Sequence, residues 1–210
     1  LSDLVVNSYQ LAQGPYALIT TDPGDGTVEI IYRSDTPLGH CQFCPGDDTT
    51  IFHVHETGGD ALQRMWMFDL SSRQRRPFYV EGDDDWVTHE TWDATGSYMT
   101  FIRWPHAIMI GDKSGEDFQV VARGEFHHCA PSPTGKWIVA DRTSTGEILL
   151  IDAATGQVHT LVTGQKATRG EDHCHPSFNR AGNKICFTSP KGPVPQIAIM
   201  DLRQLTWFTP

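Results

Sequence analysis

The chain has 210 residues, of which 39% are hydrophobic and 20% charged, a composition typical of a globular protein rather than a disordered or collagenous one. Its formal net charge of −10 argues against nonspecific nucleic-acid binding, which depends on a surface rich in Lys and Arg. No apolar run approaches the ~20 residues that a transmembrane helix needs, so a membrane-spanning chain is not expected.

Most of the chain consists of short β-rich runs separated by turn residues. The first two runs, 16–21 and 27–32, flank the hairpin signal Asp-Pro-Gly-Asp-Gly at 22–26. Further runs are predicted at 50–55, 63–70, 76–80, 98–104, 118–122, 137–141, 147–152, 158–163, 172–178, 184–188, 196–202 and 205–209. No segment keeps a 3.6-residue apolar period, so an all-β fold is predicted.

A repeat organises these runs. When the turns at Asp47, Gly96, Gly135 and Gly182 are aligned, a histidine stands seven residues before each of them. These histidines are His40, His89, His128 and His175, at spacings of 49, 39 and 47 residues. Repeats of about 40–50 residues with four short strands each are typical of propeller blades.

The predicted architecture is therefore a β-propeller of four-stranded antiparallel blades. The chain supplies about four and a half blades, with residues 1–35 as the outer strands of the earliest one, in a single domain spanning 1–210. A compact four-bladed ring is one arrangement. The favoured one has further blades before Leu1. Those blades, or a second chain, would complete the ring, because closure protects the sheet edges.

The repeated histidines predict a site in the central channel. The first strand of each blade lines that channel, so equivalent positions should converge at one mouth. In the predicted strand 172–178, His173 and His175 are two residues apart and should project from one face.

Three imidazoles with room for water or substrate describe a catalytic or ligand-binding metal centre. His128, His173 and His175 are the predicted ligands, and His89 is left to act as a base. A histidine beside a cation is held neutral, the form that accepts a proton. His40 and His55 are assigned to the channel and substrate.

The remaining histidines are given other places. His127 is expected to be packed or solvated, because it neighbours His128 on a strand. His53 is expected to be structural, and His106 and His159 to lie at the surface or an edge. His55 with Glu56 would support a ligand through hydrogen bonds.

Arg64 is unusual in the apolar segment 64–68. Two interpretations remain open for it: a structural one, as an edge residue or in an ion pair with Asp69 or Glu56, and a functional one, as a guanidinium that binds a substrate carboxylate.

Five cysteines, an odd number without a regular framework, predict free thiols and a reducing compartment. Cys41 and Cys44 have C-x-x-C spacing, but a second pair and a βαβ pattern are missing, which favours a structural role. The chain begins with Leu1 and shows no signal-peptide pattern, so either the N-terminus is processed or the chain is part of a longer one.

An ordered set of short motifs resembles the oligogalacturonate lyase family. The motifs lie between about residues 35 and 202 and comprise Gly39-His40, Pro45-Gly46-Asp47-Asp48, His55-Glu56, Arg64-Met65-Trp66, Thr88-His89-Glu90-x-Trp92, His128 with Ser132-x-x-Gly135, and His173-x-His175-Pro176-Ser177-Phe178. The resemblance implies a seven-bladed propeller with Mn²⁺ in its channel.

By position, the resemblance also implies metal ligation by His128, His173 and His175, a base at His89 and an active-site arginine at Arg64. The family's fourth protein ligand is a Gln, and Gly170 stands in its place here, which leaves that position to water, Glu171 or a shifted loop. The segment between the His128 and His173 blades is also shorter than in the family.

The implied chemistry is β-elimination of a short oligogalacturonide to a 4,5-unsaturated uronate, with His89 removing the proton on C5. One alternative is a non-catalytic propeller that binds a ligand or protein partner. Another is a hydrolase or lyase for a different uronic-acid polymer. A cytoplasmic location is expected from the free thiols and from the family's use of imported small oligomers.

Overall fold

A computed structural model describes residues 3–12, 14–56, 62–83, 85–166 and 173–210. Their contacts divide the chain into two compact units, Leu1–Val87 and Thr88–Pro210. The single-domain prediction for 1–210 therefore remains a prediction. In the described part of the chain, no helix is long and apolar enough to cross a membrane.

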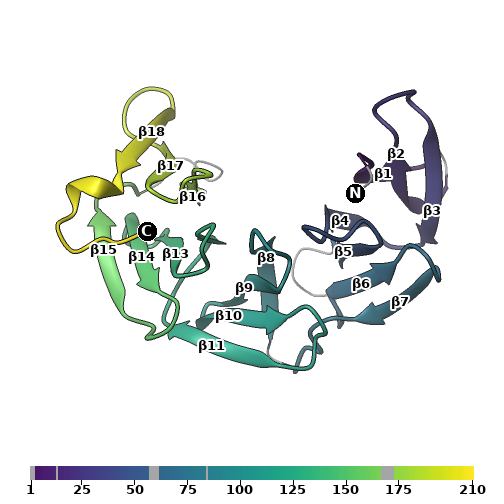
Figure 1. Ribbon diagram of the computed structural model, residues 1–210, viewed down its shortest axis with the longest axis horizontal. Helices are drawn as coiled ribbons and strands as arrows, with labels where there is room; N and C mark the ends of the chain where they lie inside the picture. Colours follow the sequence, from purple (N-terminus) through teal and green to yellow (C-terminus); the bar gives the residue numbers. More distant parts are fainter. Residues whose placement is uncertain (1–2, 13, 57–61, 84, 167–172) are drawn as a thin grey trace. The chain divides into compact units, whose positions relative to one another are not determined.

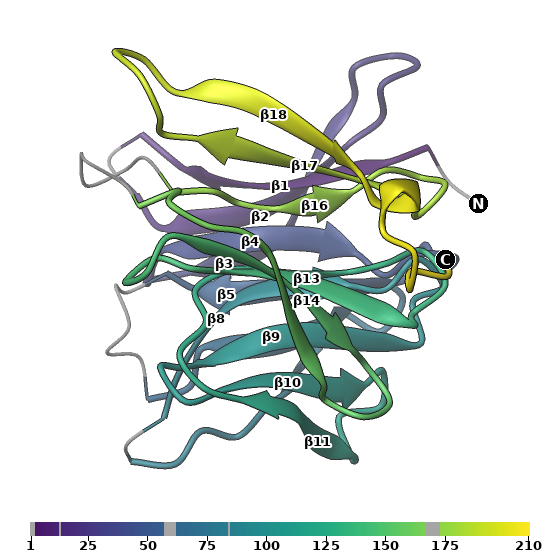
Figure 2. The same cartoon turned by 90° about the vertical axis from the view of Figure 1, so that its left-hand side faces the viewer.

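The described residues form five antiparallel sheets, each a meander of consecutive strands (Figures 1 and 2). The first two sheets contain β1 (Val5–Gln10), β2 (Tyr16–Thr21) and β3 (Val28–Ser34), then β4 (Leu38–Phe43), β5 (Thr50–His55), β6 (Met65–Asp69) and β7 (Gln74–Pro77). The third contains β8 (Trp86–Trp92), β9 (Tyr98–Trp104), β10 (Ala107–Asp112) and β11 (Phe118–Arg123).

The last two sheets contain β12 (Cys129–Pro131), β13 (Trp137–Arg142), β14 (Glu147–Asp152) and β15 (Val158–Val162), then β16 (Ser177–Phe178), β17 (Lys184–Ser189) and β18 (Gln196–Asp201). The one helix among the described residues is the 3₁₀ turn η1 (Leu202–Gln204). Three sheets have four strands and two have three, which confirms the all-β prediction and the division into blades.

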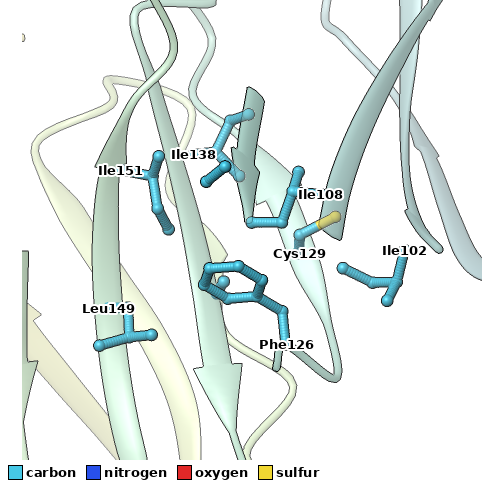
Figure 3. Packing of buried hydrophobic residues seen from close by; sticks show 9 residues of the cluster. Ile102, Ile108, Phe126, Cys129, Ile138, Leu149 and Ile151 are labelled. Atoms are coloured by element: carbon cyan, nitrogen blue, oxygen red, sulfur yellow. The ribbon is translucent and has the colours of Figure 1, made fainter. Parts of the chain in front are cut away.

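The central strands of the fourth sheet are buried on both faces. Ile138 of β13 and Leu149 and Ile151 of β14 join Ile102 and Phe126 in one core cluster (Figure 3). Their neighbours in sequence, among them Val139 and Leu150, join a second cluster with residues of β17 and the C-terminal segment. Alternate side chains of a strand point to opposite faces, so an uninterrupted apolar run such as Ile148–Ile151 fits a sheet that lies between two others.

The repeat is confirmed when it is counted from the residue that closes each first turn. The backbone N–H groups of Cys44, Asp93, Ser132 and Asn179 pair with the carbonyls of Thr50, Tyr98, Trp137 and Lys184. Each repeated histidine lies four residues before that closing residue. The β4–β5 turn is one residue longer than the others, and Asp47, whose N–H donates to the Cys44 carbonyl, holds the position that a glycine holds in the other three turns.

Three of the four repeated histidines adopt a left-handed backbone conformation. His40, His89 and His175 have φ values of +48°, +57° and +43°. This region is uncommon for residues other than glycine, although histidine is enriched there several-fold. The shared conformation is independent support for structural equivalence of these positions.

The predicted strand 172–178 is wrong over most of its length, because β16 covers only Ser177–Phe178. Residue 172 lies outside the described part of the chain. His175 has its positive φ, and Pro176 has no N–H to donate to a ladder, so the strand cannot extend toward the histidines. Cys174 is nevertheless tied to β17, since its carbonyl accepts a hydrogen bond from the Thr188 N–H at 2.8 Å.

Candidate metal centre

The second unit, Thr88–Pro210, gathers five imidazoles into one cluster. His128 is central to it: the ring centroids of His175, His127, His89 and His173 lie 3.6, 4.1, 4.2 and 5.5 Å from its own. His89 lies in β8, whereas His127 and His128 directly precede β12, and His173 and His175 precede β16. The predicted convergence of His89, His128, His173 and His175 is therefore present, although His128, His173 and His175 reach it from loops rather than from a strand face.

Three of these side chains form the predicted ligand set. One ligand atom from each of His128, His173 and His175 lies within 4.8 Å of the other two. Imidazole nitrogens at this spacing can converge on a divalent ion such as Zn²⁺ or another first-row transition metal.

The structure also places His127 in the cluster. Its ring lies edge-on to those of His89 and His173, at centroid distances of 4.9 and 4.5 Å, and 5.2 Å from the ring of Trp104. With His89 and His128 it forms a second group whose ligand atoms lie within 4.8 Å of one another. The expectation that His127 is merely packed or solvated assumed a regular strand, which begins only at Cys129.

The carboxylate of Asp141 fixes the orientation of His128. Asp141 is 1% exposed, and its Oδ1 accepts the His128 backbone N–H at 2.7 Å. His128 Nδ1 lies 3.1 and 3.0 Å from the two carboxylate oxygens. The opposite ring nitrogen, Nε2, is buried and has no hydrogen-bond partner among the described residues, so it is a candidate metal-ligating atom.

The electrostatics keep two of the cluster's imidazoles neutral. Burial, followed by the charge of His128, lowers the pKa of His127 to about 4. The same causes in the same order lower the pKa of His175. Burial alone would raise the pKa of Asp141, but hydrogen bonding and charge from His128 bring it below its usual value. Neutral imidazoles and an ionised carboxylate are the protonation states that metal binding requires.

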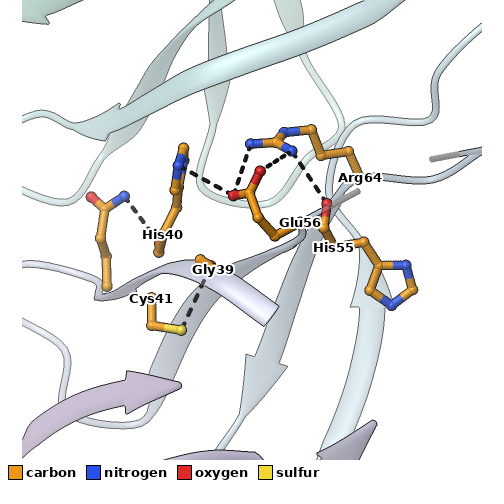
Figure 4. A network of polar contacts seen from close by, with 7 residues as sticks. Gly39, His40, Cys41, His55, Glu56 and Arg64 are labelled. Carbon is orange, nitrogen blue, oxygen red and sulfur yellow. Dashed lines mark hydrogen bonds and ion pairs between the residues drawn. The ribbon is translucent and has the colours of Figure 1, made fainter. Parts of the chain in front are cut away.

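Arg64 and His40 meet in the first unit, Leu1–Val87, at the carboxylate of Glu56 (Figure 4). Arg64 Nη1 and Nη2 lie 3.3 and 3.5 Å from Oε1 and Oε2 of Glu56, and Nη1 also donates to the His55 carbonyl at 3.2 Å. His40 Nε2 lies 3.4 Å from Glu56 Oε2. The Arg64 side chain is 4% exposed, so the ion-pair interpretation describes its observed state.

Gly39 makes room for this network. A Cβ at Gly39 would lie 2.7 Å from Glu56 Oε2, closer than a side chain tolerates. His55 takes a different direction: its ring points away from Glu56 in Figure 4. The His55 ring packs on Trp66 at 5.6 Å and has Nε2 3.4 Å from Arg75 Nη1. The structure thus brings the backbone of His55, but not its imidazole, to Arg64.

The other predicted residues fall as follows. His53 is fully buried and stacks on Tyr32 at 6.0 Å, in keeping with a structural role. His159 stacks on Trp207 at 4.4 Å, and His106 is exposed. Gly170 and Glu171 lie outside the described residues.

All five cysteines are free thiols. Cys41 donates from Sγ to the Gly39 carbonyl at 3.6 Å. The metal-binding groups formed by the described residues do not include Cys41 or Cys44.

Sequence reasoning missed His127 and Asp141. The signal for Asp141 was a lone carboxylate directly after the apolar run Trp137–Ala140, where a buried charge needs a partner. The signal for His127 was only its adjacency to His128. In a regular strand, neighbouring side chains point to opposite faces, so this adjacency argued against a place for His127 in the cluster.

Two curated relatives match 90% of this chain. The oligogalacturonide lyase of Pectobacterium atrosepticum is 23% identical, and the oligogalacturonate lyase of Dickeya dadantii is 30% identical. The chain spans 56% of the length of each relative. No protein-family model matches the chain. The resemblance inferred from the motifs is thus confirmed at the level of sequence similarity.

Solved structures show the same fold. A structure described as oligogalacturonate lyase in complex with manganese superposes with a TM-score of 0.82 at 22% identity, covering 92% of this chain and 56% of that one. An oligogalacturonate lyase from Vibrio parahaemolyticus gives 0.78 at 23% identity, covering 89% and 55%. TolB from Acinetobacter baumannii gives 0.69 at 18% identity, covering 95% and 49%. These neighbours confirm the predicted β-propeller fold.

Proposed function

We propose that this chain carries the metal centre of a lyase that cleaves short oligogalacturonides by β-elimination. The observation that carries the proposal is the three-imidazole set His128, His173 and His175, in a chain similar to oligogalacturonate lyases over 90% of its length. One similar structure is of an oligogalacturonate lyase with manganese, which makes Mn²⁺ the first metal to test here.

The residues fit such an ion. His128 Nε2 is buried and unpaired among the described residues, and the other two imidazoles present ligand atoms within 4.8 Å. When bound, a divalent cation supplies Lewis-acid stabilisation of the negative charge that develops on the uronate carboxylate as C5 loses its proton.

His89 is the proposed base of this reaction. Its ring centroid lies 4.2 Å from that of His128 and 6.4 Å from that of His175, close to the ligand set. In the proposed step His89 takes the proton from C5 and the C5–H electrons form the C4–C5 double bond. The C4–O bond breaks with its electrons on the oxygen, which takes up a proton from water as the neighbouring sugar leaves. No redox cofactor or covalent nucleophile enters this scheme.

Arg64, His40 and His55 belong to the first unit, and their substrate roles stay predictions from the sequence. The ion pair with Glu56 holds the Arg64 guanidinium in place, and planar guanidinium groups suit carboxylates. The proposed substrate is an anion and the chain has a formal net charge of −10, so binding requires a local positive charge, which a metal cation held by the histidines would supply.

The test is formation of the unsaturated product, followed by ultraviolet absorbance with digalacturonate and Mn²⁺. His89→Asn is the informative variant, because Asn tolerates the left-handed backbone at this position and cannot serve as the base. A fall in kcat of about 100-fold or more is expected, the usual contribution of general base catalysis.

His106→Asn is the matched control, since His106 is exposed, and it should leave the rate unchanged. Absence of unsaturated product from the wild-type protein with every uronate oligomer and divalent metal tried would contradict the proposal. In that case a non-catalytic ligand-binding propeller becomes the better description.

A further inference from the structure

Asp141 is a buried carboxylate in an apolar environment. It stands near the end of β13, directly after the fully buried residues Ile138, Val139 and Ala140, and Ala140 pairs with the buried Cys129 of β12. A buried charge is costly unless it is paired and hydrogen-bonded. The fold therefore places the carboxylate here for a partner, and the partner is His128.

The connection between the two residues involves backbone as well as side chain. The Asp141 N–H donates to the His128 carbonyl at 3.2 Å, and the Asp141 carbonyl accepts the His127 N–H at 3.0 Å. Oδ1 accepts the His128 N–H at 2.7 Å, and the carboxylate faces Nδ1 at 3.0 Å. Asp141 thus fixes both the chain direction and the ring rotation at His128.

This arrangement selects one tautomer of His128. A carboxylate accepts but does not donate when it is ionised, so Nδ1 must carry the hydrogen and Nε2 must carry the lone pair. Nε2 is the buried atom without a hydrogen-bond partner among the described residues.

We propose that Asp141 is a positioning residue for the metal centre: it holds His128 in the Nδ1–H tautomer and directs the Nε2 lone pair toward the ion shared with His173 and His175. This inference rests on the proposed function only through the metal site, and concerns affinity rather than turnover. Carboxylate partners of metal-ligating histidines orient the ring and raise its basicity.

The first test is metal affinity, measured by titration calorimetry with Mn²⁺ and with Zn²⁺ on the metal-free protein. Asp141→Asn keeps the size of the side chain and an oxygen for the His128 N–H, but removes the charge that selects the tautomer. The affinity is expected to fall about 10- to 100-fold, the usual cost of losing such a partner.

Asp93→Asn is the matched control. Asp93 is also buried, at 4% exposure, but its carboxylate caps the β8–β9 turn by accepting from Thr95, Ser97 and Tyr98. That variant should lose stability without losing metal affinity. Equal affinities for wild type and Asp141→Asn would overturn the inference.

The second test needs no variant, so it holds even if Asp141→Asn fails to fold. Long-range ¹H–¹⁵N NMR on the metal-free wild-type protein reports which nitrogen of His128 carries the hydrogen. The Nδ1–H form is expected, and a dominant Nε2–H form would refute the role of Asp141. Failure of the wild-type protein to bind either metal would instead count against the metal centre of the proposed function.

Discussion

Three histidines of this chain have a left-handed backbone conformation that residues other than glycine rarely adopt. His40, His89 and His175 all have positive φ, a conformation that costs an L-residue roughly 1–2 kcal/mol. Backbone strain of this kind gathers at functional sites because the surrounding structure must hold it in place. Two of the three belong to the histidine cluster, which supports the inference that the cluster is more than a packing feature.

His53 predicts the pH dependence of stability. Burial, followed by the charge of Arg75, lowers its pKa from 6.5 to about 3. Below pH 6.5 the unfolded chain therefore binds a proton at this residue that the folded chain excludes, and stability falls as the pH falls. Each pH unit below 6.5 should cost up to about 1.4 kcal/mol at this site.

His53→Phe removes this titrating group, and with it its share of the loss of stability at low pH, and keeps an aromatic ring to stack on Tyr32. Urea unfolding at pH 7 and pH 4.5 should show a smaller loss of stability for the variant than for the wild type. The exposed His106 offers the control His106→Gln, which should leave the pH dependence as it is. Parallel curves for His53→Phe and wild type would show that His53 titrates normally in the fold.

At the residue scale, the sequence alone predicted which kinds of side chain form the candidate site better than it predicted where each of them lies. The register of the repeat correctly grouped His89, His128 and His175. The ion pair of Arg64 with Glu56 was one of the two interpretations of Arg64. The sequence pattern could not find Asp141, whose role depends on its contact with His128 from another strand, or His127, whose place depends on β12 beginning only at Cys129. That boundary is set by local φ and by hydrogen bonds to the next strand, which a two-residue period does not contain.

Several turns between paired strands contain a glycine with positive φ, and these glycines differ in how much space a Cβ would have. Gly146 closes the β13–β14 turn and Gly26 the β2–β3 turn, with φ of +70° and +78°. A Cβ on Gly146 would lie 2.2 Å from the backbone nitrogen of Lys166, whereas a Cβ on Gly26 would meet nothing within 4 Å.

Gly146→Ala is therefore expected to destabilise the protein on the order of 2 kcal/mol more than Gly26→Ala. Both changes carry the cost of a positive φ, and only the first also pushes the segment 163–166 away. Thermal unfolding of the two variants measures the difference. Equal losses would mean that the segment moves aside freely.

That segment leads to the metal centre. The Gln165 carbonyl accepts from Cys174 Sγ at 3.6 Å, and the Gln165 side chain accepts from Ser189 Oγ at 2.6 Å. Cys174 stands between His173 and His175, so the contact at Gly146 helps fix the backbone that carries two of the proposed ligands. The sequence predicted the strand before this segment, but not the contacts of Gln165 with Gly146 and Cys174, because these residues are distant along the chain.

At the scale of the molecule, composition and repeat were enough for the all-β propeller fold. They were enough because each blade repeats the same succession of antiparallel strands and turns, so a sequence pattern that is weak in one blade is reinforced by the next. The number of blades in the complete ring is not contained in this chain, which spans 56% of its curated relatives. The seven-bladed ring with further blades before Leu1 remains a prediction.

The central claim is that His128, His173 and His175 hold a divalent metal ion. Anomalous X-ray diffraction from crystals soaked in Mn²⁺, recorded on both sides of the manganese absorption edge, tests it most directly. The expected result is one dominant anomalous peak within bonding distance of His128 Nε2 and of one ring nitrogen from each of the other two. A peak at another site, or none at the three histidines, would contradict the claim.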